Sequence, residues 1–143
     1  MTASRLRLRD HHGVPVSWPP PGPTVVVAVP YAFTDVCASE LDALDAALPE
    51  LEAAGVTAYG LSCDAPYSQR AWAEQRGWRL ELISDHWPHG ALSRELGWFD
   101  EDRGCAVRGS AYADRGTLVW NETSADHRDI GGLVRRVLAA RVG

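Results

Sequence analysis

Lysine is absent from this sequence of 143 residues, and its 14 basic residues are all arginines. A chain without lysine cannot form a Schiff base with a carbonyl substrate, nor supply the lysine of a phosphate-binding P-loop. Acidic residues outnumber basic ones by 19 to 14, and the formal net charge is -5. A nucleic-acid backbone would meet net repulsion from such a chain. Both lysine-dependent enzyme classes are therefore excluded, and no nucleic-acid partner is expected.

Long apolar runs and abundant cysteines are missing as well. The longest uninterrupted aliphatic run, Val25 to Val29, is far shorter than the roughly 20 residues of a membrane-spanning helix, so no membrane association is expected. The first residues, MTASRLRLRDHHG, lack the apolar core of a secretory signal, which predicts a cytoplasmic protein. The cysteines number three, Cys37, Cys63 and Cys105. An odd number in a chain that can form its own core predicts free thiols instead of a disulfide framework.

What is present is ordinary for a globular protein, with 45% hydrophobic and 23% charged residues. This length and composition predict a single domain over residues 1–143. Hydrophobic spacing alternates between the periods of strands and helices, which predicts the α/β class with a central mixed sheet flanked by helices. The expected elements are a hairpin of Leu6–Leu8 with Val14–Val16, a buried strand at 24–29, a helix from Asp35 to Gly55 bent at Pro49, a strand at Val56–Ser62, a helix at Pro66–Arg76, a strand at Leu80–Ser84, a short helix at Ala91–Leu96, strands at about Cys105–Ala113 and Thr117–Trp120 joined by a tight turn at 114–116, and a final helix around Ile130–Leu138.

The junction between the buried strand and the first helix is the segment most suited to chemistry, because sites gather where strands lead into helix N-termini. Its sequence is PYAFTDVC. Thr34 is a good N-cap residue, and this register places Cys37 at the third helical position. Free backbone N–H groups and the helix dipole there favour the thiolate, the nucleophilic form of cysteine. Cys37 is therefore predicted to be a nucleophile, with hydroxyls, N–H groups and an arginine around it.

The same segment resembles the active-site loop of the peroxiredoxin family. In that loop a proline is followed four residues on by Thr or Ser, and three residues later by the reactive cysteine. Pro30, Thr34 and Cys37 match this pattern, and Glu40 matches an acidic residue often found just after it. The resemblance adds a specific expectation to the nucleophile that the helix position predicts.

Further stretches resemble the family in the same order along the chain, from about Leu6 to Arg141. LSCDAPYSQRAWAEQRGW is similar to a strand followed by an Asp-started helix that contains Trp72. SDHWPHGALSRELGWF resembles the E-type alkyl hydroperoxide reductase subgroup in particular. CAVRGSAYADRGTLVW resembles the late strand that carries the family's active-site arginine, here Arg108. The chain is therefore identified as a member of the peroxiredoxin family on several separate matches.

The resemblance implies a thioredoxin-like fold and a thiol peroxidase. Cys37 would attack the O–O bond of hydrogen peroxide or an organic hydroperoxide and become a sulfenic acid. Thr34 and nearby N–H groups would orient the peroxide, Pro30 would shield the sulfenate, and Arg108 would favour the thiolate and polarise the bond. Neither a metal nor an organic cofactor is required. Val36 and Glu40 are expected at the substrate, and the sequence leaves open whether Glu40 orients Arg108 or only lies on the helix surface.

The recycling step has three alternatives. The first is a one-cysteine mechanism in which a low-molecular-weight thiol, or a thioredoxin- or glutaredoxin-like protein, reduces the sulfenic acid. The second is internal resolution by Cys63 or Cys105, although both are more typical of buried inert thiols. The third is a redox sensor or thioredoxin-fold binding protein that is oxidised without turnover. We favour the first.

Two other constellations receive a structural interpretation. Asp85, His86 and His89 have the chemistry of metal ligands, but Pro88 lies between the histidines and no second ligand pair accompanies them, so no metal site is predicted. Asp64 precedes a helix and is expected to cap it.

Histidines and aromatic residues elsewhere suggest surface roles. His11 and His12 are expected in a solvated turn after the first strand. Trp87, Trp98 and Phe99 lie close together in sequence around the short helix. Such an aromatic cluster is typical of an interface, and it predicts a homodimer.

Overall fold

The computed structural model describes residues 6–142. Residues 1–5, which open the segment in which no secretory signal is predicted, lie outside the described residues. No helix within residues 6–142 is long and apolar enough to span a membrane. In chain order the elements are β1 (Leu6–Asp10), β2 (Pro15–Trp18), β3 (Thr24–Ala28), α1 (Asp35–Ala46), α2 (Leu48–Ala53), β4 (Thr57–Ser62), α3 (Pro66–Arg76), β5 (Glu81–Ser84), α4 (Ala91–Glu95), β6 (Phe99–Asp100), β7 (Cys105–Ala106), β8 (Arg108–Asp114), β9 (Thr117–Ser124) and α5 (Ile130–Val142).

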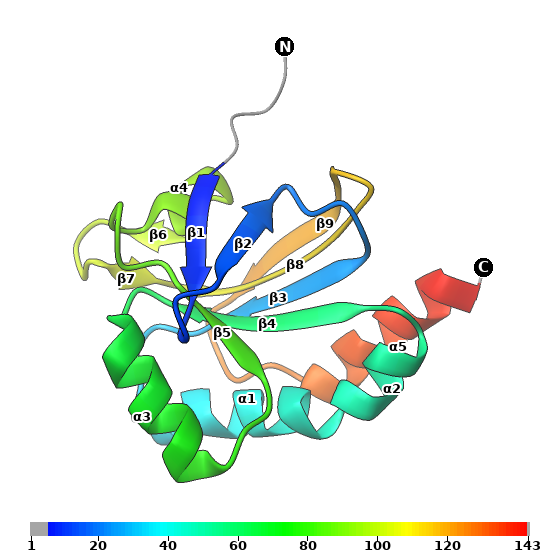
Figure 1. Ribbon diagram of the computed structural model, residues 1–143, viewed down its shortest axis with the longest axis horizontal. Helices are drawn as coiled ribbons and strands as arrows, with labels where there is room; N and C mark the ends of the chain where they lie inside the picture. Colours follow the sequence, from blue (N-terminus) through cyan, green and yellow to red (C-terminus); the bar gives the residue numbers. More distant parts are fainter. Residues whose placement is uncertain (1–5, 143) are drawn as a thin grey trace.

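Seven of the strands form one mixed sheet in the order β2-β1-β5-β4-β3-β8-β9 (Figure 1). Strands β3, β4 and β5 run parallel, whereas β1 and β8 are antiparallel to their neighbours. Every residue of β3 is buried, as predicted for a strand covered on both faces. Because parallel strands end at the same edge of a sheet, the loops after β3, β4 and β5 gather there.

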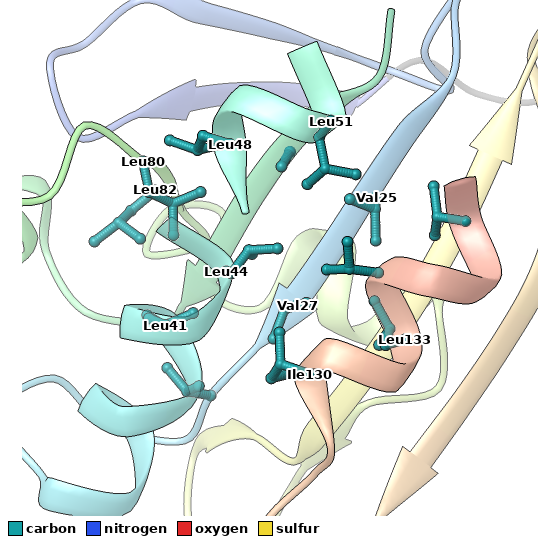
Figure 2. Packing of buried hydrophobic residues seen from close by; sticks show 14 of the residues in the cluster. Val25, Val27, Leu41, Leu44, Leu48, Leu51, Leu80, Leu82, Ile130 and Leu133 are labelled. Carbon is teal, nitrogen blue, oxygen red and sulfur yellow. The ribbon is translucent and has the colours of Figure 1, made fainter. Parts of the chain in front are cut away.

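Helices α1, α2, α3 and α5 cover one face of the sheet (Figure 1). Figure 2 shows how Leu41 and Leu44 of α1 and Leu133 of α5 pack around Val25 and Val27 of β3. Burial of each such side chain contributes about 1.5–3 kcal/mol. This packing fixes α1, and with it the start of the helix that carries Cys37, against the central strand.

The opposite face of the sheet packs against α4 and the segment that follows it. Trp98, Leu92, Leu61 and Ile83 belong to this second core, and all four are fully buried. The small β6–β7 sheet extends the same layer. Because alternate residues of a strand face opposite sides, Val25 and Val27 contribute to the first core while Val26 contributes to the second.

The helix predicted from Asp35 to Gly55 is divided into α1 and α2. The division falls at Ala47, not at a bend centred on Pro49. Pro49 has no N–H to donate to the Asp45 carbonyl four residues earlier, so it breaks the helical hydrogen-bond pattern. It is instead accommodated in the first turn of α2, where an N–H would have no partner.

The strand predicted over Cys105–Ala113 is divided at Val107. The Val107 N–H donates to the Trp98 carbonyl at 2.7 Å, and Cys105 and Ala106 pair with β6. The strand β6 is absent from the prediction because two residues are too short for a periodic signal. The turn that follows β8 is confirmed, with positive φ at Arg115 and Gly116, as a tight hairpin requires.

Two surface predictions are wrong. Trp98 is fully buried and donates from Nε1 to the Asn121 side chain at 2.7 Å, so it cannot join Trp87 in a surface cluster. Trp87 is 81% exposed, while Phe99 is half-buried beneath the Arg94 guanidinium. His11 is buried because its ring accepts the Leu82 N–H in place of a strand partner, and His12 alone is exposed.

Candidate active site

The loop between β3 and α1 positions the predicted nucleophile. Thr34 is the N-cap of α1, and Cys37 is the third residue of the helix, as the sequence predicts. The Thr34 hydroxyl makes no capping bond and donates instead to the Tyr31 carbonyl oxygen at 3.1 Å. Phe33, the residue before Thr34, holds a φ of +64°, a left-handed conformation that costs a residue with a side chain about 1–2 kcal/mol. The chain is thus turned sharply just before the helix begins.

Cys37 lies at the floor of a hollow of about 490 Å³. Only 1% of the residue is exposed, so a reactant has to enter the hollow to meet the sulfur. Val36, 44% exposed, lies at its rim. The hollow is lined by the β3–α1 loop, the start of α1 and three other segments: Pro30, Tyr31, Thr34, Asp35, Val36, Cys37, Arg103, Val107, Arg108, Ser124 and Ala125.

Arg108 is brought to Cys37 by the pairing of β3 with β8. Its Nη2 lies 3.5 Å from the Cys37 Sγ, within hydrogen-bond distance of sulfur. The other terminal nitrogen, Nη1, donates to a carboxylate oxygen of Glu40. The guanidinium side chain is only 14% exposed, so its charge acts on the sulfur with little screening by water. The structure therefore brings Pro30, Thr34, Cys37 and Arg108 to one hollow.

Glu40 is completely buried one turn after Cys37 and binds two arginines. Burial alone would raise the pKa of Glu40, but hydrogen bonds and charge from Arg128, with the charge of Arg108, outweigh it and hold the pKa below its ordinary value. The carboxylate is thus ionised and fixes the Arg108 guanidinium. Glu40 does not line the hollow, so the structure differs from the expected substrate contact and from the helix-surface alternative. Its bond to Arg108 corresponds to the other alternative, in which Glu40 orients that arginine.

Arg128 is the site residue that the sequence analysis misses. It donates to both Glu40 oxygens and to the carbonyls of Ala28 and Gly109, the latter two at 2.6 Å. The side chain thereby ties α1, β3 and β8 together behind Cys37. No local signal marks it, because it stands in the polar run ADHRD, which has the composition of a surface loop. Only its partners, distant in sequence, distinguish it.

Asp64 supports the loop and does not cap the helix after it. The N-cap of α3 is Ala65, and the Asp64 carboxylate accepts the Ala32 N–H at 2.9 Å. Ser84 donates to the Asp64 carbonyl at 2.8 Å. The ends of β4 and β5 are thus joined to the loop that precedes Cys37. This contact gives Asp64, which lies between β4 and α3, a structural role.

The other two cysteines are free, buried thiols on different parts of the fold. Cys63 belongs to the core on the face of the sheet opposite to Cys37. Burial, helped by the Asp85 charge, raises the pKa of Cys63 to about 12, so it is a thiol at neutral pH. Cys105 lies in β7 next to Tyr31, and this contact with the Cys105 thiol raises the pKa of the Tyr31 hydroxyl.

In the DHWPHG segment, Asp85 and His89 each contact a different part of the chain. The Asp85 carboxylate accepts N–H groups from Leu92 and Ser93 at 3.0 and 2.7 Å, together with the Ser93 hydroxyl at 2.7 Å, and so holds the start of α4. His89 contacts the Gly104 carbonyl through Nε2 at 2.9 Å. Asp85 is thus committed to the backbone of α4 and is not directed at the two histidines.

Comparison with known sequences fits this arrangement. The sequence profile described as "AhpC/TSA family" matches residues 5–122, so the chain belongs to this family of peroxiredoxins. Alkyl hydroperoxide reductase E of Mycobacterium tuberculosis is 41% identical over 95 residues, which are 66% of this chain and 62% of that relative. Alkyl hydroperoxide reductase C of Amphibacillus xylanus is 32% identical over 123 residues, which cover 82% of this chain and 65% of that relative. The match thus spans about 62% of the length of the E-type relatives.

Solved structures share the fold over nearly the whole chain. Enterococcus faecalis AhpC superposes with a TM-score of 0.83 at 25% identity, covering 99% of this chain and 94% of that one. Peroxidoxin BcpB of Mycobacterium tuberculosis gives a TM-score of 0.84 at 22% identity, covering 98% and 95%. The predicted thioredoxin-like α/β fold, with a mixed sheet between helices, is confirmed.

Proposed function

We propose that this protein is a thiol peroxidase that reduces hydrogen peroxide or organic hydroperoxides through Cys37. The contact between the Cys37 sulfur and the Arg108 guanidinium at the floor of an open hollow carries this proposal. Membership of the AhpC/TSA family and likeness to alkyl hydroperoxide reductases support it. No metal or organic cofactor takes part in the proposed reaction.

In the proposed step, the Cys37 thiolate attacks one oxygen of the O–O bond. An S–O bond forms as the O–O bond breaks, so the sulfur is oxidised to a sulfenic acid and the peroxide is reduced. The second oxygen leaves with the electron pair and takes up a proton, giving water or an alcohol. Arg108 stabilises the charge on the leaving oxygen. Thr34 donates its own proton to Tyr31, which leaves its oxygen free to accept a peroxide O–H and orient the substrate. Pro30, on the wall of the hollow, shields the sulfenate from water.

An external thiol, small or carried by a thioredoxin- or glutaredoxin-like protein, completes the proposed cycle. It forms a disulfide with Cys37 and releases water, and a second thiol then frees Cys37. The high pKa of Cys63 and its place on the other face of the sheet support this one-cysteine mechanism. Internal resolution by Cys105 is the second candidate, because Cys105 touches Tyr31 of the loop that precedes Cys37.

Stopped-flow measurement of Cys37 oxidation tests the activity. We expect hydrogen peroxide and an organic hydroperoxide to oxidise the reduced protein far faster than free cysteine, with trapped sulfenic acid at Cys37 by mass spectrometry. Replacing Arg108 by Leu should slow oxidation about 10²–10³-fold, as loss of a charge-stabilising donor does in other enzymes. The matched substitution Arg136→Leu, at a surface ion pair, should leave the rate unchanged. A wild-type rate equal to that of free cysteine overturns the proposal.

The products after one equivalent of peroxide separate the recycling alternatives. A stable sulfenic acid that external thiols reduce supports the one-cysteine mechanism. A Cys37–Cys105 or Cys37–Cys63 disulfide supports internal resolution. Fast oxidation without reduction by any thiol or thioredoxin-like protein in a reductant screen identifies a redox sensor or binding protein.

We further propose that the protein acts as a homodimer in the cytoplasm. Trp87 and Tyr67, 81% and 77% exposed, follow the adjacent ends of β5 and β4. Large exposed aromatic residues are typical of interfaces, and a second copy of the chain is the proposed occupant. Three free thiols suit a reducing compartment.

A further inference from the structure

Strand β1 pairs antiparallel with β5 (Figure 1). The side chains of His11, His12 and Glu81 cluster where these two strands meet. The Glu81 Oε2 oxygen is closed off from solvent and has no hydrogen-bond partner within the described residues 6–142. It lies 3.7 Å from His11 Nδ1 and 3.8 Å from His12 Nε2. These separations exceed hydrogen-bond length, so neither nitrogen satisfies the oxygen, and the Asp10 carboxylate also faces Glu81.

The spacing of these three atoms suits a shared cation. Zinc binds His nitrogen and carboxylate oxygen at about 2.0–2.2 Å, which places neighbouring ligand atoms of a tetrahedral site about 3.3–3.6 Å apart. The three candidate ligand atoms lie within 4.8 Å of one another, and His12 and Glu81 are about half exposed and can move by a few tenths of an ångström. We propose that His11, His12 and Glu81 bind a divalent transition-metal ion, with Zn²⁺ as the best match to two imidazoles and a carboxylate.

The hydrogen bond from Leu82 sets the strength of this site. The Leu82 N–H donates to His11 Nδ1 at 3.0 Å, so the imidazole carries its proton on Nε2 and its lone pair on Nδ1. The ion would take the same lone pair and displace Leu82. Binding therefore breaks one buried backbone hydrogen bond, and we expect micromolar instead of nanomolar affinity. A bound ion links the turn after β1 to the start of β5.

The site is independent of the peroxide chemistry. Leu82 and Ile83 belong to the cores on opposite faces of the sheet, so the alternation of β5 places Glu81 on the same face as Ile83. Cys37 belongs to the other face. Zinc at Glu81 should raise the melting temperature of the protein, because it binds the folded state alone, without changing the rate of Cys37 oxidation.

Titration of the reduced, full-length protein with Zn²⁺ and Co²⁺ tests the site. We expect one equivalent bound with micromolar affinity, a rise in melting temperature, and a Co²⁺ spectrum without a sulfur-to-metal charge-transfer band. His12→Ala and Glu81→Gln should each weaken binding at least tenfold. His86→Ala, an exposed histidine elsewhere, and Cys37→Ser should bind as the wild type does. Absence of binding up to millimolar zinc overturns the proposal. So does a thiolate band, or binding that survives both His12→Ala and Glu81→Gln.

Discussion

Glu40 organises the charged groups around Cys37 from one turn further along α1. Its carboxylate accepts from Arg108, which contacts the Cys37 sulfur, and from Arg128, which holds the ends of β3 and β8. Two guanidinium groups and one carboxylate leave a net positive charge beside the sulfur. That surplus would favour the developing negative charge of a leaving oxygen in the proposed reaction.

Replacing Glu40 by Gln is expected to lower the free energy of unfolding by about 3–5 kcal/mol, because two buried arginines lose their counter-charge. Oxidation of Cys37 should slow about tenfold or more, as Arg108 is no longer held. Chemical denaturation and stopped-flow kinetics measure the two effects. Glu122→Gln, which breaks the half-exposed pair with Arg136, is the matched control and should cost less than about 1 kcal/mol.

The loss of stability in Glu40→Gln should depend on pH, and the pKa of Glu40 fixes the direction. Because the folded pKa of Glu40 is depressed, its stabilising contribution is fully present above its ordinary value of 4.5 and is lost as the pH falls through the folded pKa. The stability gap between wild type and Glu40→Gln should therefore narrow in acid. A gap that is constant from pH 7 to pH 3 would contradict the assigned ionisation.

The raised pKa of Cys63 should make the stability of the protein depend on pH in the alkaline range. Its folded pKa of about 12 lies above the ordinary value of 9.0, so its contribution to stability is fully present below pH 9 and declines between pH 9 and 12. In this range the free energy of unfolding of the wild type should fall more steeply than that of Cys63→Ala, by up to about 1.4 kcal/mol per pH unit. Equal slopes for the two proteins would show that the Cys63 thiol is not protected.

At the scale of elements, the start of β8 packs tightly against the second core at Gly109, the residue after Arg108. Gly109 lies against the Trp98 indole so closely that a Cβ at this position would overlap the ring. Trp98 cannot move away easily, because it is fully buried and hydrogen-bonded to Asn121. The glycine therefore allows β8 to approach the second core while the neighbouring arginine faces Cys37.

Gly109→Ala is expected to destabilise the fold by about 1–3 kcal/mol through overpacking, and to slow Cys37 oxidation because Arg108 shifts with its strand. Thermal unfolding and peroxide kinetics measure both. Gly22→Ala provides the control, since a Cβ at Gly22 meets nothing within 4 Å. Unchanged stability of Gly109→Ala would mean that Trp98 can repack.

At the scale of the whole molecule, the proposed dimer depends on the surface around Trp87, which lies in the turn after β5. Trp87→Glu should convert the dimer to a monomer in sedimentation velocity, because a charge would be buried in the aromatic contact. Val119→Glu, a half-exposed residue on the edge strand β9, is the control and should remain dimeric. A wild-type protein that is monomeric at all concentrations, or a dimer that tolerates Trp87→Glu, rejects this interface.

Local chemistry made much of the fold and site predictable. Thr34 before an amphipathic helix predicts the register that sets Cys37 at the third position, and Gly77 ends α3 in the left-handed conformation expected of a helix terminus. Arg128, the role of Asp64 and the burial of His11 were not predictable, since each depends on partners far away in sequence.

The amino-acid sequence by itself determined the order of the longer strands and helices, the candidate nucleophile Cys37 and the family, because periodicity, capping and a spaced motif act over a few residues. The tertiary structure alone decided which charges meet. It set the Cys37 sulfur 3.5 Å from Arg108 and enclosed Glu40 between two arginines. It also placed Cys63 on the face of the sheet opposite to Cys37. Electrostatic interactions depend on distance and burial through space, and neither quantity is encoded in the spacing of residues along the chain.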